Sequence, residues 1–167
     1  MRVIKAGKVL EDNWQRIASL EQEHVLEDGD WIVPLDYWRV NRERLLRHNG
    51  RVGVCLNGDD DLEHIAEALG QLELIALEFP GFTDGRSYSH ARILRDRFRY
   101  RGELRAVGDV LRDQLFFMQR CGIDSFQVRE DKDAEDAVKG LSDFSVKYQT
   151  AADGSPPVYR FRQQAGK

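Results

Sequence analysis

Short apolar runs alternate with segments of helical spacing through the middle of the chain. The runs have the length of strands and are bounded by turn residues, which favours buried strands over helices. They occupy residues 31–35, 52–56, 72–79, 103–107 and 124–129. Each is followed by a predicted helix, at residues 37–48, around Leu62–Leu69, at 86–98, at 110–121 and at 133–143. Five such units with short connections indicate parallel strands joined by right-handed crossovers.

The helix around Leu62–Leu69 has the clearest pattern of the five. Leu62, Ile65, Ala66 and Leu69 stand at positions i, i+3, i+4 and i+7. On an α-helix these positions form one apolar stripe, which predicts a helix that packs against the sheet.

The two ends of the chain alternate like strands instead. Residues 2–10 predict a small hairpin that turns at Ala6-Gly7. Residues 144–161 predict a second hairpin around the turn residues Asp153–Pro157.

The chain contains neither an internal repeat nor a low-complexity linker, so residues 1–167 are expected to form one domain with its core at residues 30–143. The expected fold is α/β, with five strand–helix units that form a mainly parallel sheet flanked by helices, and with short terminal hairpins. A partial TIM-like barrel is the alternative, because five such units also suit an arc of a barrel.

The composition excludes several classes of protein. A hydrophobic content of 41% with 32% charged residues excludes wholesale disorder, and two cysteines are too few for a disulfide scaffold. No apolar run approaches the roughly 18 residues of a membrane span, and the first residues lack a signal-peptide core. We expect a soluble, cytoplasmic protein without membrane association. No metal site or cofactor is expected, because no recognised ligand spacing occurs.

Charge is distributed unevenly along the chain. Residues 1–80 carry a net charge of −7, whereas residues 81–129 carry ten arginines and six acidic side chains, a net charge of +4. Arginine presents a planar fork of donors that suits carboxylates and oxyanions. The middle block is therefore either a set of solvated Arg–Asp pairs or a face that binds an anion or a partner. Phe98–Arg101 alternates aromatic residues with arginine, but one such patch on an acidic protein does not favour nucleic-acid binding.

The turn at residues 80–89 is the first candidate site, because ligands bind where strands of an α/β sheet end and helices begin. Asp84 or Ser87 could cap the following helix, and Gly85 allows a tight backbone path. Free backbone N–H groups could then bind an anion, with Arg86 as its counter-charge. A purely structural turn is the alternative.

Residues 102–114 form the second candidate, where another short strand leads into a helix. Arg105, Asp109 and Arg112 are its main charged groups. If the two strands are neighbours, this loop joins Asp84 and Arg86 in one polar cluster that could bind an oxyanion or perform acid–base chemistry. The alternative is an Arg–Asp network that only holds the loops together. Cys55 is interpreted as a core residue, with a reactive role left open.

Three segments in this region have a specific combination of motifs: Phe82–Ser89, Ala91–Arg95 and Gly102–Gln114. They resemble a family of small bacterial proteins classed as domain of unknown function 934, and Arg120–Gly122 and Asp124–Phe126 continue the match. The gene for such proteins often lies beside that of the assimilatory sulfite reductase haemoprotein. The resemblance covers about residues 30–130 and implies a role at or near the reduction of sulfite to sulfide.

Two functions follow from this resemblance and from the residues. The chain lacks the four-cysteine ligation of a siroheme/iron–sulfur centre and a dinucleotide fingerprint. It is therefore expected to be an accessory protein that supports the sulfite reductase haemoprotein or its electron donor. The alternative is a small enzyme or binder that uses the Asp84/Arg86 and Asp109/Arg112 loops to hold an oxyanionic metabolite. Whether the protein is an enzyme, and its oligomeric state, stay open.

Overall fold

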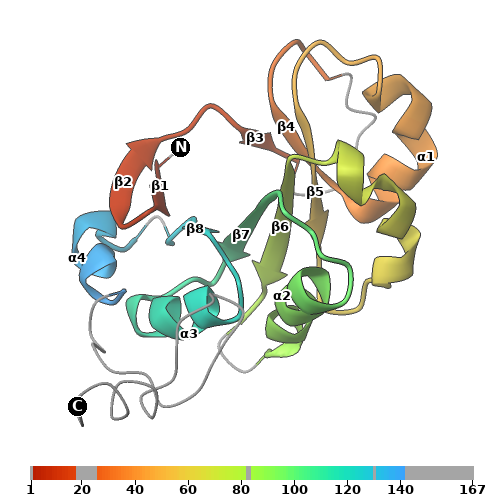
Figure 1. The fold of residues 1–167 in the computed structure, drawn as a ribbon. Coiled ribbons are helices and arrows are strands. Elements are labelled where there is room, and N and C mark those ends of the chain that lie inside the picture. Colours follow the sequence, from red (N-terminus) through yellow and green to blue (C-terminus); the bar gives the residue numbers. More distant parts are fainter. Residues whose placement is uncertain (1, 18–25, 82–83, 130, 142–167) are drawn as a thin grey trace, which may run out of the picture.

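One curled sheet of eight strands organises the molecule, and the computed structural model describes residues 2–17, 26–81, 84–129 and 131–141 (Figure 1). The strands follow the order β2-β1-β8-β7-β6-β5-β4-β3. Neighbouring strands from β3 to β8 are parallel, and β1 is antiparallel to both β2 and β8. The strands are β1 Arg2–Lys5, β2 Lys8–Glu11, β3 Gln15–Arg16, β4 Trp31–Pro34, β5 Val52–Leu56, β6 Leu74–Phe79, β7 Glu103–Gly108 and β8 Ser125–Phe126.

Helices connect the parallel strands from β4 to β8, and one more helix follows β8. The α-helices are α1 Leu35–Leu45, α2 Arg86–Asp96, α3 Leu115–Arg120 and α4 Ala134–Lys139, and the 3-10 helices are η1 Leu62–His64, η2 Ala66–Gln71 and η3 Arg112–Gln114. The mixed α/β class is thus confirmed, and the curled half-barrel fits the partial-barrel alternative (Figure 1). No helix in the described residues combines the length and apolar character that a membrane crossing needs.

The helix predicted around Leu62–Leu69 is instead two 3-10 helices, η1 and η2. The buried positions explain the difference. Leu62, Ile65 and Ala68 are buried, whereas Ala66 is only half-buried. A repeat of three residues matches the 3.0 residues per turn of a 3-10 helix better than the 3.6 of an α-helix.

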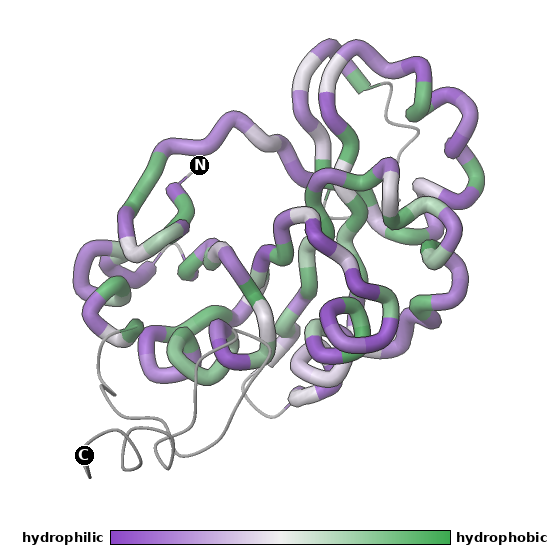
Figure 2. Tube along the Cα trace, viewed as in Figure 1, coloured by the Kyte–Doolittle hydropathy of each residue, from purple (hydrophilic) through white to green (hydrophobic). Residues whose placement is uncertain are grey.

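The two faces of the sheet have different environments. Along β6, Ile75, Leu77 and Phe79 pack with the helices in the main core, while Leu74 and Ala76 point to the concave face. On that face they form a smaller apolar cluster with Trp14, Ile32, Cys55 and Val107. Figure 2 shows hydrophobic positions concentrated along the central strands and hydrophilic ones on the helix surfaces and loops. The strands are apolar on both faces because both faces are buried.

The predicted N-terminal hairpin is confirmed as β1 and β2. Its turn residues Ala6 and Gly7 have φ values of 51° and 71°. Two left-handed residues in a two-residue turn match the right-handed twist of the strands they join. The second hairpin, predicted at residues 144–161, lies outside the described residues.

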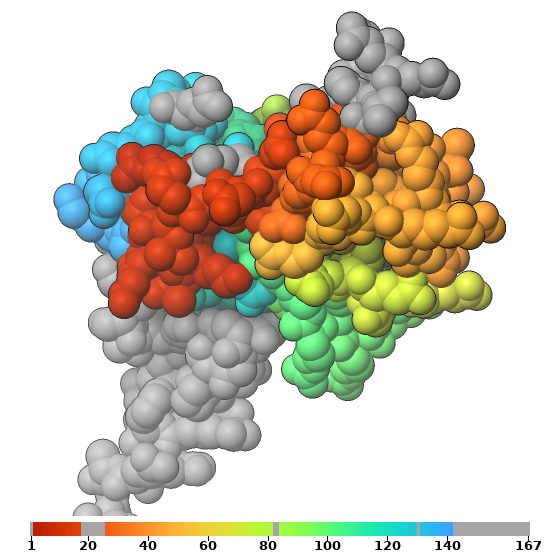
Figure 3. Space-filling model, turned by 90° about the horizontal axis from the view of Figure 1, so that it is seen from above, coloured from red at the N-terminus to blue at the C-terminus, as the bar shows by residue number. Residues whose placement is uncertain are grey.

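The segment after this hairpin joins the two ends of the sheet. β2 and β3 are the two edge strands, yet only Asp12, Asn13 and Trp14 separate them in sequence. We call residues 12–14 the strap. It crosses the concave face, where Trp14 joins the apolar cluster and Asp12 contacts β7. Figure 3 shows the N-terminal segment running over the top of the molecule from one side to the other.

Gly108 at the end of β7 offers a test of the sheet edge. Its φ is 92°, and a Cβ there would lie 2.5 Å from the backbone oxygen of Phe79. Gly108→Ala is therefore expected to lower the free energy of unfolding by about 1–3 kcal/mol. Chemical denaturation measures the change.

The matched control is Gly70→Ala, because a Cβ at Gly70 meets no atom within 4 Å. This variant is expected to leave stability unchanged or to raise it by less than about 1 kcal/mol. Equal stability of the two variants would contradict the packing described for Gly108.

Candidate functional site

The carboxyl edge of the sheet is the place where the first predicted site residues lie. Asp84 and Gly85 follow β6, and Arg86 is the first residue of α2. The backbone N–H of Arg86 donates to Asp84 Oδ1 at 3.1 Å. Its guanidinium forms a fork on the same carboxylate, with Nε 3.0 Å from Oδ1 and Nη2 2.7 Å from Oδ2. Nη1 pairs with Asp59, in the loop after β5.

The Arg86 side chain packs closely against Gly58. A Cβ at Gly58 would lie 2.8 Å from Arg86 Nε and 2.9 Å from Arg86 Cβ, so the glycine makes room for this side chain. Hydrogen bonds from Arg86 lower the pKa of Asp84 to about 2. The carboxylate therefore stays charged at neutral pH and compensates the guanidinium. Arg86 stands between two carboxylates and is not an uncompensated counter-charge for an anion.

Ser87 has a structural contact in this arrangement. Its side chain is buried, and Oγ donates to the backbone oxygen of Glu78 at 2.5 Å. This hydrogen bond holds the start of α2 against β6. The hydroxyl is thus engaged with the sheet rather than directed to a ligand.

The second predicted loop lies beside the first, as expected for neighbouring parallel strands. The backbone N–H of Asp109, directly after β7, donates to the backbone oxygen of Phe79 at the end of β6. The side chains pair in other directions, however. Arg129 Nη1 donates to Asp109 at 3.0 Å, and Arg112 Nη1 donates to Asp136 on α4 at 3.0 Å. The loops adjoin, but Arg86 and Arg112 each pair with a carboxylate of a different element.

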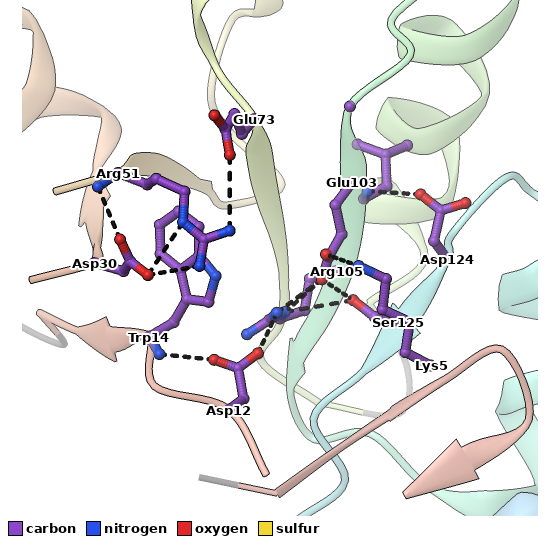
Figure 4. A network of polar contacts seen from close by, with 12 residues as sticks. Lys5, Asp12, Trp14, Asp30, Arg51, Glu73, Glu103, Arg105, Asp124 and Ser125 are labelled. Atoms are coloured by element: carbon purple, nitrogen blue, oxygen red, sulfur yellow. Dashed lines mark hydrogen bonds and ion pairs between the residues drawn. The ribbon is translucent and has the colours of Figure 1, made fainter. Parts of the chain in front are cut away.

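Arg105 does not lie at the edge of the sheet. It is in the middle of β7, points to the concave face and is 1% exposed. Its Nη2 donates to Glu103 Oε1 at 2.7 Å and to Asp12 Oδ2 of the strap at 2.6 Å (Figure 4). Its Nη1 is buried and has no hydrogen-bond partner within the described residues.

Glu103 is the centre of this buried network. It accepts hydrogen bonds from Lys5 Nζ at 2.5 Å, from Ser125 Oγ at 2.6 Å and from Arg105. Burial alone would raise its pKa, but these three donors outweigh burial and lower the pKa to about 2. The network ties β1, β7, β8 and the strap together (Figure 4).

A second group of contacts fixes the strap at its other end. The backbone N–H of Trp14 donates to Asp12 Oδ1 at 2.7 Å, and the Arg51 guanidinium lies 4.9 Å from the centre of the Trp14 ring. Arg51 also pairs with Asp30 at 2.6 Å and with Glu73 at 3.7 Å (Figure 4). No pattern in the sequence singles out Trp14 or Arg51, because their partners are distant in sequence and are brought together by the curl of the sheet.

The Cys55 thiol is on the concave face near the Arg16–Glu78 ion pair, whose closest atoms are 3.3 Å apart. Burial raises the pKa of Cys55 to about 12, and the charge of Glu78 adds to the shift. The thiol is therefore protonated at neutral pH, whereas a reactive cysteine needs its thiolate. No group of three or more histidine, cysteine or acidic residues in the described chain is arranged to hold a metal ion.

Free cations gather at the opposite edge, where the strands begin. Arg44 lies in the last turn of α1 and Arg47 lies between α1 and β5, whereas Arg99 and Arg101 lie between α2 and β7. Unlike the arginines of the carboxyl edge, these four have no carboxylate within ion-pair distance among the described residues. We call them the amino-edge arginines. The basic block predicted at residues 81–129 is thus mostly neutralised, and the available positive charge lies along this edge.

Glu103 makes stability depend on pH. Its pKa falls from 4.5 to about 2 on folding, so its ionised form stabilises the folded state above pH 4.5. That contribution is lost as the pH falls from 4.5 towards 2. Glu103→Gln removes it, so the variant is expected to be less stable at pH 7 and to lose less stability over that interval. Denaturation in urea at a series of pH values measures both effects.

The exposed Glu67 supplies the control, since its carboxyl group forms no ion pair among the described residues. Glu67→Gln is expected to keep the pH dependence of the wild type over the same interval. If stability fell equally with pH in the wild type and in Glu103→Gln, the network would not be lowering the pKa of Glu103.

Comparison with known proteins agrees with the motifs on these loops. The sequence profile of a family described as bacterial proteins of unknown function, DUF934, matches residues 53–159. The match includes β5 to α4, and with them both candidate loops, Arg105 and Glu103. No curated protein matches the chain. Because the profile matches well over half of the sequence, the chain belongs to the DUF934 family of bacterial proteins.

Proposed function

We propose that the protein is an accessory factor of assimilatory sulfite reduction, which docks on the sulfite reductase haemoprotein or on its electron donor. The resemblance described for residues 82–114 supports the pathway. One structural observation carries the docking: the amino-edge arginines form no ion pair within the part of the chain that the structure describes, although the protein as a whole has a net charge of −4.

Charge complementarity is the physical basis of this docking. Positive charge that is already paired within a protein attracts a partner weakly, whereas free cations at one edge steer an acidic surface towards that edge. Arg86, Arg112 and Arg129 belong to the first kind, since each pairs with aspartate. Arg44, Arg47, Arg99 and Arg101 belong to the second. Screening by salt acts over about 10 Å at 0.1 M, so such an encounter weakens as ionic strength rises.

The role in sulfite reduction is tested by growth of a deletion strain on sulfate, sulfite, sulfide or cysteine as the sole sulfur source. The strain is expected to fail on sulfate and sulfite and to recover on sulfide or cysteine. A plasmid copy of the gene restores growth if the defect comes from this protein. Normal growth on all four sources would contradict the proposed pathway.

Docking is tested with the charge reversal Arg44→Glu/Arg47→Glu. Association of the wild type with the haemoprotein or the donor is expected at low ionic strength and to weaken with added salt. The double variant is expected to associate at least tenfold more slowly. Lys132→Glu/Lys139→Glu changes the net charge equally at exposed positions of another surface and is expected to associate like the wild type.

A binder of an oxyanionic metabolite is the second candidate function, and Arg105 favours it. The arginines of the Asp84/Arg86 and Asp109/Arg112 loops are held by carboxylates, but Arg105 Nη1, buried on the concave face, has no hydrogen-bond partner among the described residues. Binding there predicts that sulfite, sulfate or phosphate raises the melting temperature more than chloride at equal ionic strength. Arg105→Lys should reduce that difference. No anion-specific stabilisation of the wild type would remove this candidate.

A further inference from the structure

A small cleft opens at the amino edge, between the end of α1 and η2. Its volume is about 210 Å³. Trp38, Leu46 and Leu72 provide apolar walls, and Leu46 is 60% exposed at its mouth. The volume is below the roughly 300–1,000 Å³ of pockets that enclose a small metabolite. It is of the size that receives a single apolar side chain.

The walls of the cleft are held by contacts of their own. His48 Nε2 lies 2.7 Å from the backbone oxygen of Gly29, and Arg51 is fixed by Asp30 and Glu73. His48 and Arg51 both line the cleft. A preformed cleft costs a partner little ordering of the protein when it binds.

Positive charge lies beside this cleft. Arg44 and Arg47 line a neighbouring hollow, which shares His48 with the cleft and also holds Asp28 and Glu43. Both arginines are exposed and have no ion pair among the described residues. Arg42 on the same helix stacks over Trp38 with its guanidinium 5.2 Å from the ring centre. Protein interfaces concentrate their binding energy in this arrangement, in which a desolvated apolar anchor is surrounded by a polar rim.

We infer that this cleft is the anchor point of the docking proposed above: it receives one apolar side chain from an acidic segment of the partner, whose carboxylates pair with Arg44 and Arg47. The inference rests on the proposed docking function and specifies its chemistry. Steering comes from the arginines, and the lifetime of the complex comes from the anchor.

The test is Leu46→Glu in the full chain, with binding to the purified haemoprotein and to the electron donor measured by calorimetry. A carboxylate at the mouth of the cleft repels an acidic segment and opposes an apolar anchor, so affinity is expected to fall at least tenfold. Leu46→Ala, which only removes apolar surface, is expected to weaken binding less. Because Leu46 is exposed, both variants are expected to keep the melting temperature of the wild type within a few degrees.

Leu10→Glu is the matched control, since Leu10 is a 45% exposed apolar residue of β2 that lines neither the cleft nor the hollow beside Arg44 and Arg47. It is expected to bind within twofold of the wild type. Wild-type affinity of Leu46→Glu, or equal loss in Leu10→Glu, would overturn the anchor while the docking itself stands. Absence of any binding by the wild type would instead overturn the docking function. A wild-type dimer that Leu46→Glu dissociates would show that a second copy occupies the cleft, which also overturns the inference.

Discussion

The strap between β2 and β3 is the constraint on which the rest of the structure depends. These are the two edge strands of an eight-stranded sheet. Seven inter-strand spacings would separate them by roughly 34 Å in a flat sheet. The four Cα–Cα steps from Glu11 to Gln15 span at most about 15 Å. The sheet must therefore curl, and its concave face must be narrow enough for Asp12 to reach Arg105 on β7.

The positions of most strands could be predicted from the sequence, but their pairing could not. Apolar runs locate β5, β6 and β7 within two residues, because buried strands need continuous apolar sequence. β3 has only two residues, Gln15 and Arg16, and its place depends on pairing with β4. The two 3-10 helices after β5 were also beyond a pattern argument, because Leu62 and Ile65 are three residues apart, a spacing that suits both helix types.

The sequence predicts two candidate loops that adjoin at one edge of the sheet, but the chemistry of these loops depends on the direction in which each arginine side chain points. That the loops after β6 and β7 adjoin follows from parallel neighbouring strands. Nothing in the sequence indicates that Arg86 pairs with the loop after β5, that Arg112 reaches α4, or that Arg105 pairs with the strap. A charge count along the chain also does not show which arginines are paired. Those at the carboxyl edge contact carboxylates, whereas the amino-edge arginines form no ion pair among the described residues.

The buried pair of Asp12 and Arg105 also sets an order of events during synthesis. The two residues are 93 positions apart. At about 5–20 residues per second, the ribosome completes the N-terminal hairpin roughly 5–20 s before it adds Arg105, the partner of Asp12. An isolated two-stranded hairpin is marginally stable in water, so the β1–β2 hairpin is not expected to stay folded during that interval. Its contacts with β7 and β8 can form only after those strands have been synthesised, so closure of the half-barrel follows their synthesis.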